Sequence, residues 1–425
     1  MLDLKYIREN PQVVKDAVRA KGEDCDIDAI LKIDKKRREL ISEKESLEAK
    51  KNRVSKKISI AKKQGQDVSS LIADMRLVSE KIAVLTSSLR DTEQKLNDEL
   101  LTVPNLPQSD VPVGVDETAN KIVRYHGDRR DFDFKPRPHW EIGEIIGALD
   151  IPRGVKISGS GFYTLTGPGA MLERALINFM LEMHTVEHGY KEVMVPYLAG
   201  KKAMISTGQI PKLAEDMYDL PDDGLYLIPT AEVPVTNLHA GEILSLEQLP
   251  KYYCAFSPCF RREAGSYGKE VRGITRVHQF HKVEMVKIVE PETSNEELEK
   301  LLADAEDILR KLDLPYRVVL LSTADLSFAA AKCYDLEVYA PGMDSWLEVS
   351  SCSNYGSFQT RRMNLRYRPQ KGAKPVYLHT LNGSGLALPR TVIGILENYQ
   401  QADGSVTLPD VLKPYMRGTE KIEPI

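Results

Sequence analysis

Two long stretches of heptad-patterned sequence, separated by one turn, restrict the possible folds of this chain more than any other feature. Residues 27–64 contain neither proline nor glycine, and apolar residues recur there every three, four or seven positions. They are Ile30, Ile33, Leu40, Leu47, Val54, Ile58 and Ala61. Gly65 interrupts the pattern, which resumes at Leu71 and continues to Leu96. Because this spacing places apolar side chains on one helix face, we expect an antiparallel two-helix hairpin over about 27–101.

The first helix of this hairpin is strongly basic. Residues 27–64 hold 13 Lys and Arg against 6 Asp and Glu, a net charge of +7, whereas the whole chain has a formal net charge of -4. Such charge can simply solvate a helix face, and a coiled coil can simply hold a dimer together. One-sided positive charge on a rod roughly 55 Å long also suits the phosphate backbone of a nucleic acid. These residues alone leave the interpretations open.

A cluster of prolines follows the hairpin. Pro104, Pro107 and Pro112 predict a boundary between domains. We therefore expect an N-terminal domain over 1–103, a linker over 104–115 and a second domain over 116–425. In the second domain, most strand-like runs follow one another without an intervening helix. This order predicts an α+β fold in which helices pack on an antiparallel sheet.

Composition excludes several classes of protein. The chain is 42% hydrophobic and 28% charged, and it has no run of 18 apolar residues and no signal-peptide pattern. We therefore expect a cytoplasmic protein without a membrane partner. Its five scattered cysteines favour reduced thiols over a disulfide framework. Cys254 and Cys259 have no second Cys or His pair at zinc spacing, so we expect no zinc site.

The stretch from Tyr252 to Glu284 carries the densest chemistry. Two strand-like runs flank a loop rich in charge and glycine, which predicts an antiparallel hairpin. The first run ends in Phe260-Arg261-Arg262-Glu263, and the second contains Phe280 and Glu284. Arginine matches phosphate oxygens, an aromatic ring can stack on a purine, and glutamate can bind an ammonium group or a metal. A solvated edge with surface ion pairs is the simpler explanation of the hairpin alone.

A helix followed by a proline-containing strand precedes this hairpin. The pattern predicts a helix over Ala170–His188, ended by Gly189, and then a strand over 190–198 that contains Pro196. Because proline is confined to strand edges or ends, this strand should lie at a boundary. A subunit interface and a simple sheet edge both fit.

Three further segments bring polar residues to strand ends or faces. A short strand over 226–228 leads to Thr230 and Glu232. The strand over 345–351 is expected to place Glu348 on a buried face with Trp346 and Ser350, which is costly unless the carboxylate is paired or binds a metal. Residues 377–385 are expected to form a strand that ends in a glycine turn. The helix that follows carries Arg390 near its start, where it could reach a ligand.

In this order the segments resemble a class II aminoacyl-tRNA synthetase, and they closely resemble the bacterial seryl-tRNA synthetase family along the whole chain. The three class II motifs correspond to Ala170–Pro196, Phe260–Glu284 and Leu381–Arg390. The seryl enzymes also share the two-helix arm and three short motifs. These are Thr230-Ala231-Glu232, Glu348-Val349-Ser350-Ser351 and Asn382-Gly383-Ser384-Gly385.

The resemblance implies a homodimeric serine–tRNA ligase. Such an enzyme activates L-serine with ATP to seryl-adenylate, releases pyrophosphate, and transfers the seryl group to tRNA(Ser). Where a selenocysteine tRNA exists, tRNA(Sec) is expected to be charged as well. The arm is expected to grip the long variable arm of the tRNA by shape and backbone.

The resemblance also implies roles for individual residues. Arg261, Glu348 and Arg390 are expected to be catalytic. The expected serine contacts are Thr230, Ala231, Glu232, Glu284 and Ser384. The expected ATP contacts are Arg261, Arg262, Glu263, Val277, Phe280, Glu348, Val349, Ser350, Ser351 and Arg390. Mg²⁺, carried by ATP, is expected at Glu348 and Ser351.

Two other functions are compatible with parts of the sequence. A related ligase could load an amino acid onto a carrier protein, although such relatives lack the long arm. The chain could also be a coiled-coil nucleic-acid-binding protein with a vestigial synthetase domain. Intact Arg261, Glu284, Glu348, Ser384 and Arg390 argue against that possibility.

Overall fold

The computed structural model describes residues 1–264 and 272–425, which form two compact units. The helical unit comprises Leu2–Arg19 and Glu23–Pro104, and the sheet unit comprises Met1, Ala20–Gly22 and Asn105–Ile425. All five cysteines are free. Within the described ranges, no helix combines the length and the apolar character needed to cross a membrane.

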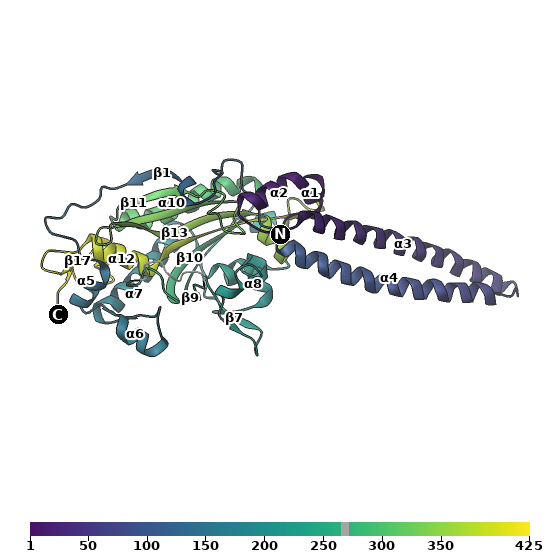
Figure 1. Cartoon of the computed structure of the whole chain (residues 1–425), viewed down its shortest axis with the longest axis horizontal. Coiled ribbons are helices and arrows are strands. Elements are labelled where there is room, and N and C mark those ends of the chain that lie inside the picture. The colour runs from purple at the N-terminus through teal and green to yellow at the C-terminus, as the bar shows by residue number, and fades with distance from the viewer. Residues whose placement is uncertain (265–271) are drawn as a thin grey trace. The chain divides into compact units, whose positions relative to one another are not determined.

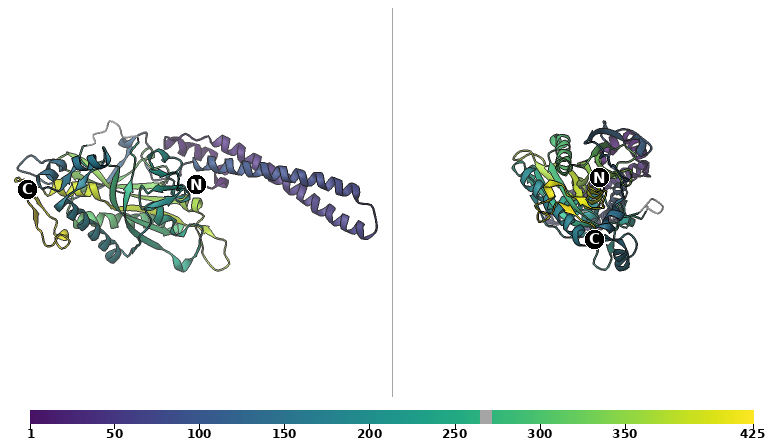
Figure 2. Two further views of the ribbon diagram at one scale, coloured as in Figure 1. Left: turned by 90° about the horizontal axis from the view of Figure 1, so that it is seen from below. Right: turned by 90° about the vertical axis from the view of Figure 1, so that its left-hand side faces the viewer.

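The helical unit contains the predicted hairpin. Helices α3 (Ile27–Lys63) and α4 (Ser69–Leu101) run side by side in Figure 1 and stay adjacent in the left view of Figure 2. The Asp26 carboxylate accepts a hydrogen bond from the Ala29 amide and so caps the start of α3. The buried side chains of α4 are Met75, Val78, Leu85, Leu96 and Leu100. Two short helices, α1 (Leu4–Glu9) and α2 (Pro11–Ala20), precede the hairpin. The prediction of a hairpin over about 27–101 is confirmed.

A buried carboxylate ties α3 to α1. The Asp34 side chain is fully buried, and its Oδ2 accepts hydrogen bonds from Arg8 Nη1 at 3.0 Å and from Arg38 Nε at 3.1 Å. A buried charge is costly unless it is paired. Arg8 therefore ties the start of α3 to α1, and Arg38 pairs with Asp34 within α3.

The sheet unit is built on an eight-stranded sheet with the order β1-β11-β12-β13-β16-β10-β9-β4. All neighbouring pairs are antiparallel except β4 and β9. The strands are β1 (Lys121–His126), β4 (Lys191–Glu192), β9 (Lys251–Phe260), β10 (Gln279–Val289), β11 (Tyr316–Leu320), β12 (Lys332–Ala340), β13 (Ser345–Gly356) and β16 (His379–Ala387). The predicted antiparallel sheet and the β9–β10 hairpin are thus confirmed.

Shorter strands and several helices complete the sheet unit. The short strands are β2 (Leu149–Asp150), β3 (Thr164–Leu165), β5 (Leu198–Gly200), β6 (Asp219–Leu220), β7 (Leu225–Leu227), β8 (Ile243–Ser245), β14 (Arg366–Arg368), β15 (Val376–Tyr377), β17 (Val406–Thr407) and β18 (Lys421–Ile422). The α-helices are α5 (His139–Ile145), α6 (Ile151–Ser158), α7 (Gly167–Glu182), α8 (Lys201–Thr207), α9 (Glu232–Thr236), α10 (Ser294–Lys311), α11 (Phe358–Met363) and α12 (Leu388–Asn398).

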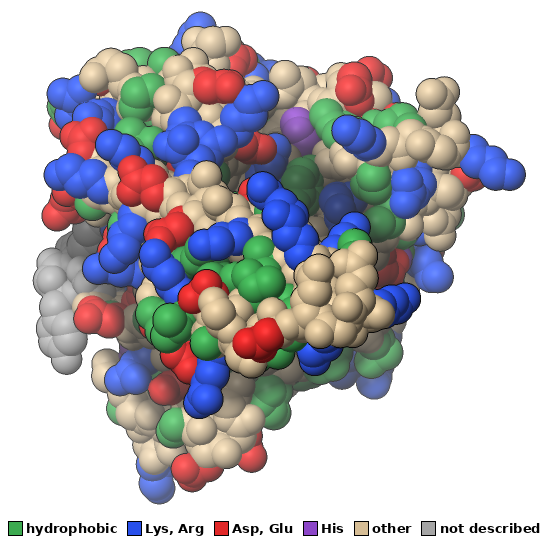
Figure 3. All heavy atoms as spheres, turned by 90° about the vertical axis from the view of Figure 1, so that its right-hand side faces the viewer, with side chains coloured by type: hydrophobic (Ala, Val, Ile, Leu, Met, Phe, Trp, Pro, Cys, Tyr) green, Lys and Arg blue, Asp and Glu red, His purple; other side chains and the backbone are tan. Residues whose placement is uncertain are grey.

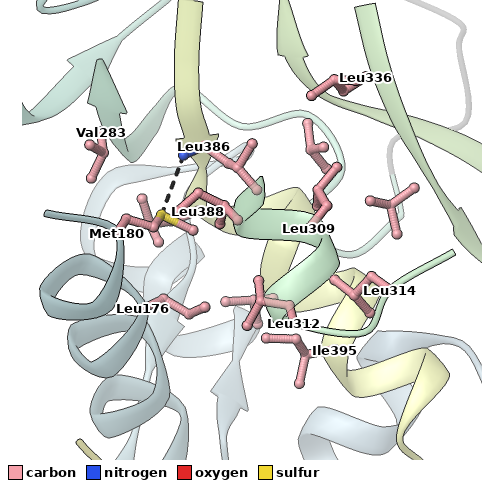
Figure 4. Close-up of a cluster of buried hydrophobic side chains, with 14 of the residues drawn as sticks. Leu176, Met180, Val283, Leu309, Leu312, Leu314, Leu336, Leu386, Leu388 and Ile395 are labelled. Carbon is pink, nitrogen blue, oxygen red and sulfur yellow. Dashed lines mark hydrogen bonds between the residues drawn. The ribbon is translucent and has the colours of Figure 1, made fainter. Parts of the chain in front are cut away.

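The hydrophobic core joins α7, α10 and α12 to the large sheet. Figure 4 shows Leu176 and Met180 of α7 converging with Leu309 of α10 and Ile395 of α12. The sulfur of Met180 also accepts a hydrogen bond from the Leu386 amide at 3.3 Å. This contact fixes the end of β16 on α7. The core thereby holds β16 and the start of α12 in place for the site described below.

Two expected elements differ from the structure. Helix α7 begins at Gly167 and not at Ala170, because Pro168 has the backbone angle of a first helical turn and needs no amide partner there. The strand expected over 190–198 is two short strands, β4 and β5, which belong to different sheets. Pro196 lies between them and cannot donate to a ladder.

The glycine turn expected at residues 382–385 is also wrong, because this segment lies inside β16. There Gly383 pairs with Met285 of β10, and Ser384 pairs with Glu284. Pairing with β10 and β13 keeps the backbone extended. Glycine is needed at 383 for packing, since a Cβ atom there would lie 2.8 Å from the sulfur of Cys352.

Candidate active site

A cavity of about 640 Å³ in the sheet unit gathers most of the residues that the sequence singled out. Eleven of the fifteen line it: Thr230, Glu232, Arg261, Glu263, Val277, Phe280, Glu284, Glu348, Ser351, Ser384 and Arg390. They come from β10, β13, β16, the starts of α9 and α12, and adjoining loops. A cavity of this size suits a small-molecule ligand.

The structure does not bring the other four side chains into the cavity. Ala231 and Val349 are buried in apolar clusters. The Ser350 hydroxyl donates a hydrogen bond to the Ser384 carbonyl oxygen at 2.6 Å. The Arg262 guanidinium lies 5.8 Å from the ring centroid of Tyr218. These four side chains therefore face protein neighbours, not the cavity.

One part of the cavity is lined by carboxylates and hydroxyls. The buried Glu284 carboxylate lies 2.5 Å from Lys282 Nζ and accepts a hydrogen bond from the Thr230 hydroxyl at 3.1 Å. Phe280, Lys282 and Glu284 alternate along β10, so one face of the strand presents all three. Ser384 lies opposite Glu284 on β16. These groups can bind a ligand that carries an ammonium group and a hydroxyl.

Glu232 adds a second carboxyl group to this part of the cavity. It begins α9 and is buried, and its Oε1 accepts a hydrogen bond from Gln359 Nε2 at 2.7 Å. Burial, together with the nearby charge of Glu284, raises the pKa of Glu232 to about 7. At neutral pH the group is therefore divided between its charged and neutral forms. A cation bound beside it would favour the charged form.

Arginines line another part of the cavity. The Arg261 guanidinium lies 5.2 Å from the ring centroid of Phe280, and its Nε donates to the Pro229 carbonyl oxygen at 3.3 Å. Arg276 Nη1 donates to Glu263 Oε2 at 2.9 Å. Planar cations beside an aromatic ring suit a nucleotide phosphate and its base. The predicted loop between β9 and β10 includes residues 265–271, which lie outside the described residues.

Arg390 and Glu348 are paired at the mouth of the cavity. Arg390 Nη1 donates to the Glu348 carbonyl oxygen at 2.8 Å and to Glu348 Oε2 at 3.2 Å. Its Nε donates to the Thr275 carbonyl oxygen at 3.1 Å. The Arg390 guanidinium group therefore links the start of α12 to β13 and to the end of the β9–β10 loop.

The expectation that Glu348 shares a buried face with Ser350 is wrong. The Glu348 side chain is 45% exposed, whereas Ser350 is buried. Opposite β13, Leu336 pairs with Ser350 and the next residue, Glu337, pairs with Glu348. Val349 is therefore an extra residue, a β-bulge that shifts the alternation of side chains. Because of this shift, Glu348 and Ser351 both line the cavity.

Ser351 is held by a carboxylate from the neighbouring strand. Its hydroxyl donates a hydrogen bond to Asp335 Oδ1 at 2.6 Å. With its proton engaged there, the Ser351 oxygen can accept from Cys333 Sγ, 3.1 Å away, and still has a lone pair for a further partner. Two protein oxygens, from Glu348 and Ser351, suit a cation that takes its other ligands from phosphates. Among the described residues, no group of three or more His, Cys, Asp or Glu could hold a metal by itself.

The sequence interpretation missed several residues of this region. Lys282 could have been found, because it alternates with Phe280 and Glu284 on the same strand. Gln359 and Asp335 gave no local signal, since each reaches the site from an element distant in sequence. Tyr355 lines the cavity and donates to Asn382 Oδ1 at 2.9 Å.

Family models match both parts of the chain. The "Seryl-tRNA synthetase N-terminal domain" matches residues 1–107. The "tRNA synthetase class II core domain (G, H, P, S and T)" matches residues 216–399. The second match includes Arg261, Glu284, Glu348 and Ser384.

Comparison with full-length relatives indicates the same family for this chain. The chain is 54% identical over 422 residues to a serine–tRNA ligase of Thermomicrobium roseum, covering 99% of this chain and 95% of the relative. It also matches the crystal structure of seryl-tRNA synthetase from Pyrococcus horikoshii complexed with ATP, with a TM-score of 0.94, 37% identity and complete coverage of both chains. The crystal structure of a cytoplasmic serine–tRNA ligase from Naegleria fowleri in complex with AMP matches with a TM-score of 0.89 and 31% identity, over 100% of this chain and 99% of that one. The chain therefore belongs to the seryl-tRNA synthetase family.

Proposed function

We propose that the chain is a serine–tRNA ligase that activates L-serine with ATP and transfers the seryl group to tRNA(Ser). The observation that carries the proposal is a single cavity that joins a carboxylate-and-hydroxyl part to an arginine-and-aromatic part. The first part suits a small hydroxyl-bearing amino acid, and the second suits ATP. The match to a relative crystallised with ATP supports the second assignment.

The serine site is proposed at Thr230, Glu232, Glu284 and Ser384, with Ala231 contributing through its backbone. Two carboxyl groups that face one ligand favour an ammonium group. The Thr230 and Ser384 hydroxyls can bond the hydroxyl of serine. Alanine would leave these buried polar groups unpaired, which costs enough to reject it by roughly 10⁴-fold.

The ATP site is proposed at the arginine-lined part of the cavity. Arg261 would hold the α-phosphate and the serine carboxylate as the carboxylate oxygen attacks the α-phosphorus and pyrophosphate leaves. Phe280 and Arg390 would stack on the purine from opposite sides. Glu263 and Val277 line the cavity beside them. Arg262, Val349 and Ser350 would act through their backbones or by shaping the strands, since their side chains do not line the cavity.

Glu348 and Ser351 would hold Mg²⁺ together with the phosphates of ATP. Such a site needs only one or two protein oxygens, and the hydrogen bond that Ser351 donates to Asp335 leaves its oxygen able to bind a cation. When bound, the ion would neutralise phosphate charge. The residues present fit this role.

The remaining parts of the proposal concern the partners. The terminal ribose hydroxyl of the tRNA would attack the carbonyl carbon of seryl-adenylate, forming the ester and releasing AMP. Residues 1–103 would bind the tRNA, 104–115 would form a linker, and 116–425 would carry out catalysis as a homodimer in the cytoplasm. Charging of tRNA(Sec) is proposed where that tRNA exists.

Amino-acid-dependent ATP–pyrophosphate exchange tests this function. Across the twenty amino acids, we expect exchange with serine to exceed exchange with alanine, threonine and the others by orders of magnitude. Charging of total tRNA with labelled serine should follow. Exchange with another amino acid, or labelling of a carrier protein in place of tRNA, would contradict the proposal.

The efficiency of serine activation is expected to depend on pH through Glu232. Because the pKa of Glu232 is raised to about 7, its carboxylate is lost as pH falls below that value. A neutral Glu232 binds the serine ammonium weakly, so kcat/KM for serine should fall toward acid pH. Exchange rates at limiting serine, measured from about pH 5.5 to 8.5, check this. A profile that is flat near pH 7, or one that Glu232→Gln leaves unchanged, would contradict the assignment.

A further inference from the structure

Gln359 of α11 lies behind Glu232 and is fully engaged in hydrogen bonds. It is only 1% exposed and does not line the cavity. Its Nε2 donates to Glu232 Oε1 at 2.7 Å and to the Thr207 carbonyl oxygen at 3.2 Å. Its Oε1 accepts a hydrogen bond from the Thr380 hydroxyl at 2.7 Å. Both ends of the amide are therefore satisfied by protein groups.

These partners decide which way the amide points. The carbonyl of Thr207 can only accept, so the group that faces it must be the NH₂ group. The same NH₂ group faces Glu232. Thr380, on β16, fixes the opposite end of the amide by donating to its oxygen. Thr207 at the end of α8 and Thr380 on β16 therefore fix the amide in the orientation that donates to Glu232.

The other groups around Glu232 determine how much its charged form depends on the hydrogen bond from Gln359. Glu284 on β10 lies close enough to disfavour a second negative charge, and Lys282 lies 2.5 Å from the carboxylate of Glu284. Tyr355 on β13 also lies near Glu232, although its hydroxyl donates to Asn382 Oδ1 at 2.9 Å. The hydrogen bond from Gln359 favours the charged form of Glu232, because a donor stabilises a carboxylate more than a carboxylic acid.

We propose that Gln359 is a positioning residue for amino-acid selection, whose amide donor holds the Glu232 carboxylate in place at the cavity and favours its ionised form. This role rests on the proposed function, because it concerns how the ammonium group of serine is bound. Gln359 itself would not touch the substrate. Its contribution should appear in the binding of serine and not in the binding of ATP.

Gln359→Met tests the role, because methionine has a similar length and no donor. We expect KM for serine to rise by roughly tenfold or more, since a hydrogen bond to a charged group is lost. The acid limb of kcat/KM for serine should move to higher pH. KM for ATP should stay near the wild-type value. A merely structural side chain would not shift the pH profile.

Gln400→Met is a matched control. Gln400 is also buried, and its amide makes hydrogen bonds with the backbone of Arg137 and Glu397, away from the cavity lining. Its replacement should lower the melting temperature without changing the serine KM or the pH profile. If Gln359→Met behaves in the same way, Gln359 is structural and the inference is wrong.

Thr380→Val covers the case in which Gln359→Met does not fold. It retains Gln359 but removes the donor that orients its amide, so a smaller rise in serine KM and a smaller shift of the acid limb are expected. Wild-type values for both quantities would overturn the inference. Absence of serine-dependent exchange in the wild-type chain would instead overturn the proposed function, and this inference with it.

Discussion

Replacement of Glu284 by alanine is expected to abolish serine-dependent ATP–pyrophosphate exchange. The substitution removes a buried carboxylate that would bind serine and leaves the Lys282 ammonium, 2.5 Å away, buried without its partner. Thr230 also loses an acceptor. Removing one member of a buried charge pair costs about 3–5 kcal/mol of folding stability. Loss of the carboxylate that would bind the serine ammonium group separately lowers activity. A fall in kcat/KM for serine on the order of 10³-fold is therefore expected.

Two further variants separate catalysis from folding. Glu284→Ala combined with Lys282→Met removes both charges, so it should recover much of the thermal stability while exchange stays lost. Glu337→Ala removes the partner of Arg317 on the same sheet, outside the cavity lining, and should retain exchange. Serine-dependent exchange in a folded Glu284→Ala variant would refute the assignment of the serine site.

Deletion of the helical hairpin is expected to abolish tRNA charging while adenylate formation continues. The cavity residues all lie in the sheet unit, so we expect pyrophosphate exchange to continue without α3 and α4. The ends of the hairpin can be rejoined by a short turn, because Cys25 Sγ and Thr102 Oγ1 are 3.5 Å apart. Removing 27–101 should therefore leave exchange near the wild-type rate, with aminoacylation of tRNA undetectable.

A shorter deletion guards against indirect effects. Removing residues 41–89 retains Asp34 with its two arginines and the pair between Arg37 and Glu93 at 3.2 Å. It should also prevent charging, because much of the basic surface of α3 is lost. Parallel loss of exchange and charging in both deletions would show that the hairpin is needed only to maintain the fold.

Charge reversal tests the basic helix without shortening it. Figure 3 shows Lys and Arg side chains interspersed with Asp and Glu on the face that it views. Lys50, Lys56 and Lys57 are exposed on α3. Their joint replacement by glutamate should raise KM for tRNA, with a weaker dependence of binding on salt. Replacement of the exposed Lys371 and Lys374, between β14 and β15, by glutamate is the matched control and should leave KM for tRNA unchanged.

Much of the fold could be predicted from local patterns. The hairpin was predicted because heptad spacing determines which helix face is apolar, and these faces are buried on α4 and mostly half-buried on α3. The β9–β10 pair was predicted because two apolar runs flank a loop. Arg261 and Glu284 could be named as site residues because the segments that carry them resemble the class II synthetase motifs.

Other features depend on contacts that no local pattern contains. The bulge at Val349 exists because of the register between β12 and β13, and it decides that Ser351 lines the cavity while Ser350 does not. The glycine segment of β16 is extended because strands pair with it on both sides. Local propensity indicates a turn there, and tertiary pairing overrides it.

By itself the sequence determined the helical arm, the antiparallel class of the sheet and the chemical types of the site residues, because residue identity and periodicity are local properties. Only the tertiary structure decided which side chains share one cavity, that Gln359 supports Glu232, and that the pKa of Glu232 is raised to about 7. Burial and strand register arise from residues far apart in the chain, and they set both the orientation and the charge of a side chain.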